Sequence, residues 1–336
     1  MTVVGPFGLS VRDQALEADV QAGLAAVEEG LLEATKSEVP FITEAAQHLV
    51  RAGGKRFRPL LVMLAAQFGD PYAPGIVPSA VVVELTHLAT LYHDDVMDEA
   101  EVRRGVDSAN TRWGNSVAVL TGDFLFARAS HILADLGPEA VRVQAEAFER
   151  LVTGQILETA GPQDGRDPVE HYLDVLSGKT GSLVAVSCRF GAMMSGADET
   201  VVDVLTQYGE RLGVAFQLAD DVLDIASDSH ESGKTPGTDL REGIPTMPVL
   251  RLRERAARLG LAEDVALCEL LDSDLSDDAR LAEALAQLRV HPALEQARRD
   301  TVRYAEDARA ALAPLPEVGA KAALMELCDA VVYRAG

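Results

Sequence analysis

The feature that most constrains this sequence is an apolar, helix-compatible segment that ends in a dense run of acids, and it occurs twice. Residues 84–105 read ELTHLATLYHDDVMDEAEVRRG, with Asp94, Asp95 and Asp98 at the centre. Residues 216–224 read FQLADDVLD and repeat the D-D-x-x-D spacing. On a helix, the first and last aspartates of this motif lie on one face, one turn apart. Like charges at that spacing repel by roughly 0.2–0.5 kcal/mol, so folding alone does not favour the arrangement.

A divalent cation would relieve this repulsion. One or two carboxylates, completed by water and substrate phosphate, are the usual protein environment of Mg²⁺. The alternative interpretation of either run is a solvated acidic face at a helix end. The repeat weakens that alternative, because two such helices facing each other across a bundle would form a multi-metal diphosphate clamp. The predicted metal ligands are Asp94, Asp98, Asp220, Asp221 and Asp224.

The composition favours helices over strands. Hydrophobic residues make up 48% of the chain, with many Ala, Leu and Val, while aromatic residues make up only 5%. We find no strand-like alternation of any length, no low-complexity linker and no short-period repeat. The sequence therefore predicts one all-α domain over residues 1–336, with an N-terminal arm at 1–11 and a bundle of roughly 10–13 helices. Apolar spacing predicts a helix at 12–36, which carries Leu16, Val20, Leu24, Val27 and Leu31 on one face. Further helices are expected at about 77–100, 138–160, 168–195 and 199–226.

The charge of the chain is strongly acidic, but its basic residues are clustered. The formal net charge is −23, from 30 basic and 53 acidic side chains, which argues against nucleic acid and anionic membrane surfaces as partners. Four basic residues crowd into 51–58, and Arg103 and Arg104 directly follow the first acidic motif. Such local clusters on an acidic protein predict a specific anion site.

The segment GGKRFRP at 53–59 is the best candidate for that anion site. Its glycines end one helix and Pro59 suits the first turn of the next, so Lys55 and Arg58 lie near a helix N-terminus. The alternative is a solvated basic turn. His87 lies seven residues before Asp94 and shares its helix face. That histidine is either a core residue or a donor to a phosphate oxygen.

Two further segments carry polar residues. SGKTGS at 177–182 lacks the spacing of a phosphate-binding P-loop, and it places Lys179 and Thr180 inside a helical run. The alternative interpretation of this lysine is a partly buried, snorkelling side chain. GKTPGTD at 233–239 is a loop past the second acidic motif, where Lys234 could belong to a lid.

Taken together, these motifs resemble those of the trans-isoprenyl diphosphate synthases, also called polyprenyl synthetases. The resemblance extends from GGKRFRP at 53–59 to GKTPGTDLREG at 233–243. It implies an isoprenoid synthase-type bundle around a central cavity, and a homodimer. It also implies Mg²⁺-dependent head-to-tail condensation of isopentenyl diphosphate with an allylic prenyl diphosphate, with about three metal ions per active site.

The resemblance assigns roles to individual residues. The isopentenyl diphosphate site consists of Lys55, Arg58, His87 and Arg104, and Arg103 contacts the allylic diphosphate. The catalytic set consists of Asp94, Asp95, Asp98, Lys179, Thr180, Gln217 and Lys234, in which the oxygen dipoles of Thr180 and Gln217 steady the carbocation. One departure is Ile244, which follows Glu242 and Gly243 where the family often has a lysine.

Product length depends on the residues below the first motif. Ala89 and Thr90 precede Asp94 by five and four residues, and both are small where short-product family members carry a bulky aromatic. A helical turn of about 5.4 Å is close to one isoprene unit. The sequence therefore predicts a long product, C30–C50, with a C20 synthase as the alternative. The bulky candidates for a deeper floor of the product tunnel are Phe124, Phe126 and Phe148.

Two other functions are alternatives that the motifs disfavour. A class I terpene cyclase needs no isopentenyl site, and its second metal motif is based on Asn, Ser and Glu. An inactive regulatory subunit usually loses aspartates or the basic motif.

The sequence also bears on the location of the protein. It has three distant cysteines, no secretory signal and no uninterrupted apolar stretch of about 18 residues, which predicts a cytoplasmic protein without a transmembrane segment. A long lipid product would be released either from solution or at a membrane surface, in the second case with the protein loosely associated with the membrane.

Overall fold

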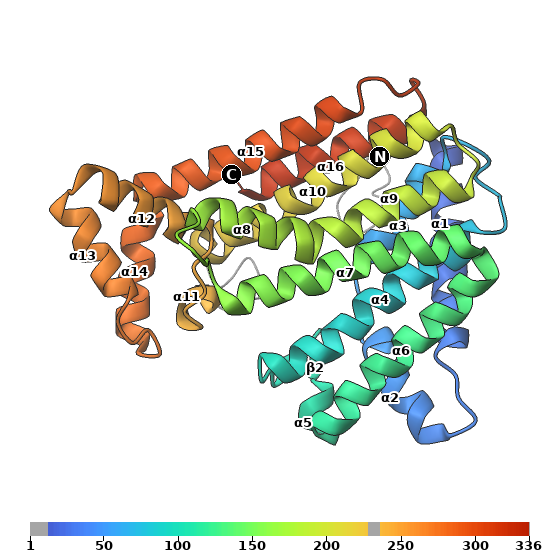
Figure 1. The fold of residues 1–336 in the computed structure, drawn as a ribbon, viewed down its shortest axis with the longest axis horizontal. Helices are drawn as coiled ribbons and strands as arrows, with labels where there is room; N and C mark the ends of the chain where they lie inside the picture. The colour runs from blue at the N-terminus through green and yellow to red at the C-terminus, as the bar shows by residue number, and fades with distance from the viewer. Residues whose placement is uncertain (1–12, 228–235, 336) are drawn as a thin grey trace. The chain divides into compact units, whose positions relative to one another are not determined.

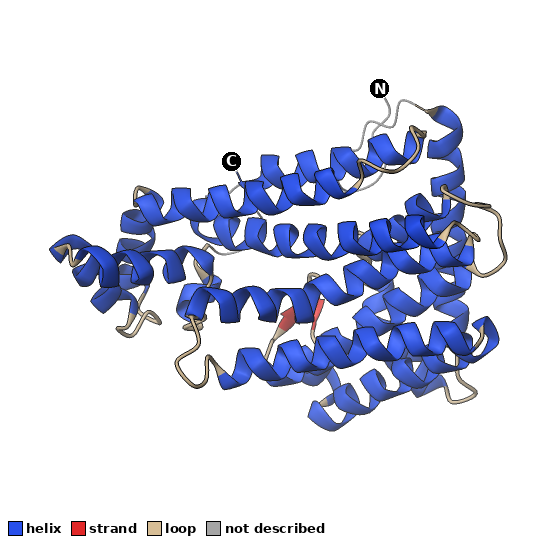
Figure 2. Cartoon of the chain, turned by 45° about the horizontal axis from the view of Figure 1, so that its top comes forward, coloured by secondary structure: helices blue, strands red, loops and turns tan. Residues whose placement is uncertain are grey.

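The computed structural model describes residues 13–227 and 236–335. Helices dominate these residues, and their strands form one antiparallel pair, β1 (Val102–Arg103) and β2 (Val106–Asp107). Figure 2 shows the helices in blue and this small ribbon in red. The predicted all-α class is confirmed. The predicted arm at 1–11 lies outside the described residues.

The chain divides into two compact units, each assembled from three separate segments. Unit 1 consists of Met1–Glu149, Leu183–Gly209 and Ala311–Glu326. Unit 2 consists of Arg150–Ser182, Glu210–Ala310 and Leu327–Gly336. Figure 1 traces the chain through its helices in order of sequence. The expectation of a single domain stays a prediction.

Unit 1 contains the helices of the first 149 residues together with parts of later ones. They are α1 (Gln14–Ala34), α2 (Pro40–Arg51), α3 (Phe57–Ala66), α4 (Ile76–Met97), α5 (Ala109–Trp113), α6 (Asn115–Leu136), the first part of α7 (Pro138–Ala160), nearly all of α9 (Ser182–Met194), the first part of α10 (Glu199–Ala226) and the start of α16 (Gly319–Ala335). Asp13 caps the N-terminus of α1, and its side chain accepts hydrogen bonds from two backbone N–H groups of the first turn. Its predicted apolar face buries Leu16, Val20, Val27 and Leu31.

Helix α4, which carries the first acidic motif, packs closely against α6. A Cβ on Gly122 of α6 would lie 2.3 Å from the His93 ring and 3.1 Å from the Ala89 carbonyl oxygen, both on α4. Only glycine allows this approach, since real Cβ contacts are longer. Figure 1 shows the two helices side by side. The contact fixes the height of the acidic motif relative to α6.

The acidic helix ends earlier than the sequence indicated, and a β-ribbon follows it. We expected a helix to about residue 100, whereas α4 ends at Met97. Arg103 pairs with Val106 in the ribbon, and the turn between them consists of Arg104 (φ 54°) and Gly105 (φ 77°). Left-handed backbone at both turn positions is what a tight hairpin requires. The two arginines are therefore held by a hairpin, not by a helix end.

Unit 2 contains the other functional segments. Its elements are α8 (Pro168–Leu176), the π-helical turn η1 (Ser177–Gly181), the second part of α10 (Glu199–Ala226), α11 (Thr238–Arg241), α12 (Met247–Leu259), α13 (Ala262–Leu271), α14 (Asp278–Arg289), nearly all of α15 (Pro292–Ala311), and the end of α16 (Gly319–Ala335). We expected one uninterrupted helix at 168–195. The π-turn η1 interrupts it at the residues SGKTG.

Within the described residues, α6 is the one helix long and apolar enough to cross a membrane, by length and composition alone. One third of its most apolar 18-residue window, 33%, is buried inside the protein. A core helix passes the same test, and α6 packs on α4. We expected no membrane-spanning segment, and α6 is one weak candidate for such a segment among the described residues.

Candidate active site

The basic segment GGKRFRP connects α2 to α3 in unit 1. Gly53 (φ 86°), Gly54 (φ 154°) and Arg56 (φ 48°) have positive φ angles, so the chain turns sharply before α3 begins. A Cβ on Gly54 would lie 2.9 Å from guanidinium atoms of both Arg56 and Arg104. The glycine therefore lets two guanidinium groups approach the loop backbone. Lys55 is exposed on this loop.

Arg58, His87 and Arg104 come together as predicted. Burial and the nearby charges of Arg58 and Arg104 lower the pKa of His87 well below its usual value. Burial also lowers the pKa of Arg58 to about 10; the charge of Glu84 opposes this shift and the charge of Arg104 adds to it. The buried Nε of Arg58 has no hydrogen-bond partner within the described residues. The cluster thus presents guanidinium donors beside a neutral imidazole.

Sequence reasoning missed the carboxylate at the centre of this cluster. Glu84 lies one helical turn before His87 on α4 and is only 2% exposed. Its Oε1 accepts a hydrogen bond of 3.0 Å from Nη1 of Arg56 and lies 3.8 Å from Nη2 of Arg104. The signal in the sequence was a glutamate inside an otherwise apolar helical run, which is unfavourable unless a cation pairs with it.

The three aspartates of the first acidic motif differ in how deeply they are buried. Asp94 is partly buried and Asp98 is exposed at the end of α4. Asp95 lies about 100° around the helix and is fully buried. Its Oδ1 accepts a hydrogen bond of 2.5 Å from Nε of Arg103, and burial raises the pKa of its carboxyl. Arg103, predicted to contact the allylic diphosphate, is thus engaged with Asp95.

The second acidic motif repeats this division in unit 2. Asp221 is 1% exposed, and its Oδ2 accepts hydrogen bonds from the Tyr172 hydroxyl at 2.8 Å and the Met247 backbone N–H at 3.3 Å. Burial raises the pKa of Asp221 to about 8, although the hydrogen bond from Tyr172 opposes the shift. Nothing in the sequence linked Tyr172 to this motif. In both motifs the middle aspartate is held inside the protein.

The two outer aspartates of the second motif also have partners. Asp220 Oδ1 accepts a hydrogen bond of 2.7 Å from Arg334, whose guanidinium lies 4.6 Å from the Phe216 ring. Asp224 accepts backbone N–H groups of Thr238 and Asp239 at 3.2 and 3.3 Å. Asp224 therefore anchors the end of the predicted lid loop.

The π-turn η1 positions the predicted Lys179 and Thr180. Lys179 Nζ donates to Glu158 at 2.6 Å, and Thr180 Oγ1 lies 3.5 Å from Gln217 Oε1. A Cβ on Gly154 of α7 would lie 2.5 Å from the Lys179 backbone nitrogen, so α7 closely approaches the turn. Thr180 and Gln217 are thus brought together as predicted. Single π-turns inside helices are frequent at functional sites.

The predicted lid involves Lys234 and Arg241. Lys234 lies outside the described residues. Arg241, which could replace the lysine missing at Ile244, instead donates to Asp278 at 2.6 Å and to the Ser276 carbonyl at 3.1 Å. These contacts are made at an exposed side chain, so water competes for them.

Small buried side chains lie below the first acidic motif. Ala89 is fully buried, and Thr86 accepts a hydrogen bond of 2.9 Å from Gln144 of α7. Among the predicted bulky residues, the rings of Phe126 and Phe148 lie 4.5 Å apart, and Phe126 lies 5.7 Å from the His93 ring. This aromatic pair therefore lies beside the α4 segment that carries Ala89.

The aspartate carboxylates fit a Mg²⁺ ion whose remaining ligands are oxygens of a diphosphate and water. The described residues contain no group of three or more His, Cys, Asp or Glu side chains arranged to hold a metal. Mg²⁺ usually keeps several waters and binds through one or two carboxylates plus substrate phosphates. Pairs such as Asp94 and Asp98 fit that requirement, whereas they would not form a complete protein cage.

Comparisons with known proteins bear on this site. A family model described as Polyprenyl synthetase matches residues 39–288. The chain is 47% identical over 331 residues to a nonaprenyl diphosphate synthase of Mycobacterium tuberculosis. The alignment covers 98% of this chain and 97% of the relative. The chain belongs to the polyprenyl synthetase family. The resemblance carried by the sequence motifs is thereby confirmed.

Solved structures of this family have the fold seen here. A Corynebacterium glutamicum geranylgeranyl pyrophosphate synthase complexed with calcium and isoprenyl diphosphate matches with a TM-score of 0.87 at 43% identity, covering 97% of this chain and 99% of that chain. A Rhodobacter capsulatus decaprenyl diphosphate synthase matches with a TM-score of 0.86 at 36% identity, covering 96% and 99%. The names of these polyprenyl synthetases span short and long products.

Proposed function

We propose that this polyprenyl synthetase condenses isopentenyl diphosphate with an allylic prenyl diphosphate, releasing diphosphate and a longer all-trans product. The observation that carries the proposal is the arginine-rich anion cluster of unit 1, in a family member that also has two D-D-x-x-D helices. A class I cyclase has no use for a second anion site. An inactive subunit has no need to keep both motifs and this cluster.

Isopentenyl diphosphate binds at the basic cluster. Lys55, Arg58 and Arg104 supply cationic donors, and guanidinium groups match phosphate oxygens well. His87 contributes a neutral imidazole N–H, because its pKa is well below its usual value. The Nε of Arg58, which has no hydrogen-bond partner among the residues that the structure describes, supports this assignment, because a buried donor without an acceptor is costly until a ligand supplies one.

The allylic diphosphate is held by both aspartate motifs. Mg²⁺ bound by Asp94, Asp98, Asp220 and Asp224 would neutralise the charge that develops on the leaving diphosphate. Asp221 remains a predicted ligand, although its Oδ2 already accepts a hydrogen bond from Tyr172. Arg103, Lys179 and Lys234 complete the clamp as cationic donors. Lys179 also donates a hydrogen bond to Glu158.

The reaction proceeds by breakage of the allylic carbon–oxygen bond. The diphosphate leaves with the electron pair, and the isopentenyl double bond supplies the electrons of the new carbon–carbon bond. Thr180 and Gln217 direct oxygen dipoles at the developing cation without reacting with it. Loss of one proton restores the double bond, and the released diphosphate accepts that proton.

The product is long, C30–C50. Ala89 and Thr90 are small, so the α4 side does not block the path along which the product grows. The path narrows where the aromatic side chains of α6 and α7 approach it. The names of relatives support long products, with a nonaprenyl synthase at 47% identity and a decaprenyl synthase at 36%. A C20 product is the less favoured alternative, although a geranylgeranyl pyrophosphate synthase is 43% identical.

The protein acts as a cytoplasmic homodimer that contacts membranes only to release its product. Exposed apolar side chains on α6, Val119 at 39% and Leu120 at 66%, suit coverage by a second copy. Light scattering that gives a monomer at micromolar concentration would contradict the dimer.

A product profile tests the proposed function. Purified protein is incubated with labelled isopentenyl diphosphate, Mg²⁺ and, separately, C10, C15 and C20 allylic primers. A ladder ending beyond C25 is expected, and chelation of the metal should abolish it. A stop at C20 would favour the alternative product. Cyclic hydrocarbons from a primer alone, or no incorporation from any primer, would overturn the proposal.

A further inference from the structure

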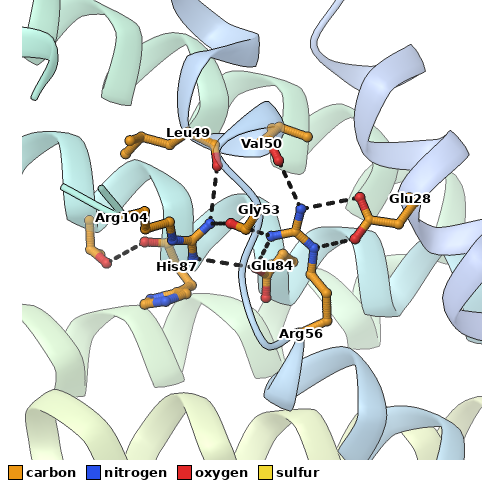
Figure 3. Close-up of polar contacts among 9 residues, drawn as sticks. Glu28, Leu49, Val50, Gly53, Arg56, Glu84, His87 and Arg104 are labelled. Atoms are coloured by element: carbon orange, nitrogen blue, oxygen red, sulfur yellow. Dashed lines mark hydrogen bonds and ion pairs between the residues drawn. The ribbon is translucent and has the colours of Figure 1, made fainter. Parts of the chain in front are cut away.

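Glu84 and Arg56 form a buried ion pair beneath the basic cluster, and neither belongs to the predicted substrate site. Glu84 is 2% exposed and Arg56 is 7% exposed. Glu84 accepts a hydrogen bond of 3.0 Å from Arg56 and lies 3.8 Å from Arg104 (Figure 3). Two cations thus share one buried carboxylate. Buried charges persist only when they are paired in this way.

Both arginines are also tied to the end of helix α2. Arg56 Nη2 donates to the Val50 carbonyl at 3.0 Å, and Arg104 Nη1 donates to the Leu49 carbonyl at 3.1 Å and to the Gly53 carbonyl (Figure 3). The last carbonyl groups of a helix lack intrahelical partners. The arginines therefore satisfy these groups and connect α2 and the hairpin to Glu84 on α4.

Arg56 is further clamped from the side of α1. Its guanidinium also forms a salt bridge with Glu28, whose side chain is 44% exposed. Burial opposes ionisation of Arg56, but the hydrogen bond to Glu28 and the charge of Glu84 raise its pKa. Arg56 is thus held in one orientation by two carboxylates and the carbonyl groups of Val50 and Gly53. Its left-handed backbone, φ 48°, sets the start of α3 and so the place of Arg58.

The balance of charge shows what Glu84 does for the cluster. Burial and the charge of Arg104 lower the pKa of Arg58, burial and the charge of Arg56 lower the pKa of Arg104, and the charge of Glu84 opposes both shifts. Guanidinium groups this close repel one another, so without a shared counter-charge they would move apart. Their spacing is therefore set before any substrate arrives.

We infer that Glu84 is a positioning residue for the isopentenyl diphosphate site. Glu84 does not contact substrate; it holds Arg104 directly and, through Arg56, the segment that carries Arg58. The inference rests on the proposed function of that site. A purely electrostatic role makes the opposite prediction, because removal of a negative charge near an anion site strengthens anion binding. The sign of the effect on affinity therefore separates the two roles.

The test uses the full chain and inorganic diphosphate, without metal, as the probe. Calorimetry should show that Glu84→Gln weakens diphosphate binding about tenfold or more, because the guanidinium groups that donate to the diphosphate are then misplaced. In steady-state assays the variant should raise KM for isopentenyl diphosphate by a similar factor. Both kcat and KM for the allylic primer should stay within about twofold, since the ion pair acts on one substrate only.

The matched control is Glu44→Gln. Glu44 pairs with Arg112 at an exposed site of the same unit, so the control removes the same charge without touching the cluster. Should Glu84→Gln fail to fold, Glu84→Asp keeps the charge but withdraws it by one methylene, and weaker diphosphate binding by about threefold or more is expected.

Tighter or unchanged diphosphate binding by a folded Glu84 variant would overturn the inference, as would a loss confined to kcat. These outcomes are distinct from failure of the proposed function. That failure would appear in the unsubstituted protein, as diphosphate binding without any condensation activity from any primer.

Discussion

His87 offers a sharp test of the electrostatics at the basic cluster. Burial and the charges of Arg58, Arg104, Arg56 and Arg103 lower the pKa of His87 well below its usual value. The unfolded chain lacks these neighbours, so there the imidazole titrates near pH 6.5. As the pH falls below 6.5, protons bind the unfolded chain but not the folded one. Stability contributed by neutral His87 is therefore present above pH 6.5 and lost as the pH decreases.

The size of this loss follows from linkage. Each pH unit below 6.5 favours the unfolded state by about 1.4 kcal/mol for as long as His87 stays neutral in the folded protein. Between pH 7.5 and pH 5 the loss amounts to about 2 kcal/mol at most. The variant His87→Gln keeps a hydrogen-bond donor but does not ionise, so it should lack this component.

The assay compares urea unfolding of the two proteins at several pH values between 5 and 7.5. The difference between their pH dependences carries the test, because other groups titrate in both proteins. Asp221 is one of them: its pKa is raised to about 8, so its own contribution to stability decreases as the pH rises through the range from 4 to 8. The exposed His131→Gln on α6 is the matched control and should follow the unsubstituted protein.

Parallel stability curves for the unsubstituted protein and His87→Gln would refute the reasoning. A variant that loses more stability than the unsubstituted protein at pH 5 would refute it more strongly. Either result would mean that His87 takes up a proton inside the folded cluster in this pH range.

Three further substitutions test other parts of the site. Tyr172→Phe removes the buried hydrogen bond to Asp221, so unfolding free energy should decrease by about 1–3 kcal/mol in denaturant titrations, and an unchanged value would contradict the role given to this contact. Ala89→Phe should shorten the longest product and, because Ala89 is fully buried, cost about 1–3 kcal/mol; a folded variant with full-length products would remove α4 as a wall of the elongation path. Phe148→Ala opens the contact with Phe126 and should lengthen the product profile, whereas an unchanged profile would place the limit elsewhere.

The positions of the helices were largely predictable from the sequence. The apolar spacing of α1 predicted the buried face that contains Leu16 and Val27, and the limits of α7 and α10 match the expected 138–160 and 199–226. The local reason is that periodic apolar residues and capping side chains act within a few positions of the chain. The β-ribbon at Arg103 was not predictable, since it depends on two residues per strand.

The π-turn η1 also escaped prediction. Nothing in SGKTG breaks a helix decisively, and glycine is only mildly unfavourable there. The distortion accompanies the close approach of Gly154 on α7, a residue more than twenty positions earlier in the chain. Contacts of this kind are tertiary, and a reading of local propensity does not contain them.

The sequence by itself determined which side chains are available for chemistry and which helix faces carry them. Two D-D-x-x-D motifs and GGKRFRP were enough for the family, the reaction class and most candidate site residues, because these signals depend on spacing along one helix or loop. Only the tertiary structure decided how the charges are divided. It placed Asp95 against Arg103, Asp221 against Tyr172, and Glu84 between Arg56 and Arg104. Burial makes an unpaired charge costly, so the partner of each charge is set by which segments meet in space, not by distance along the chain.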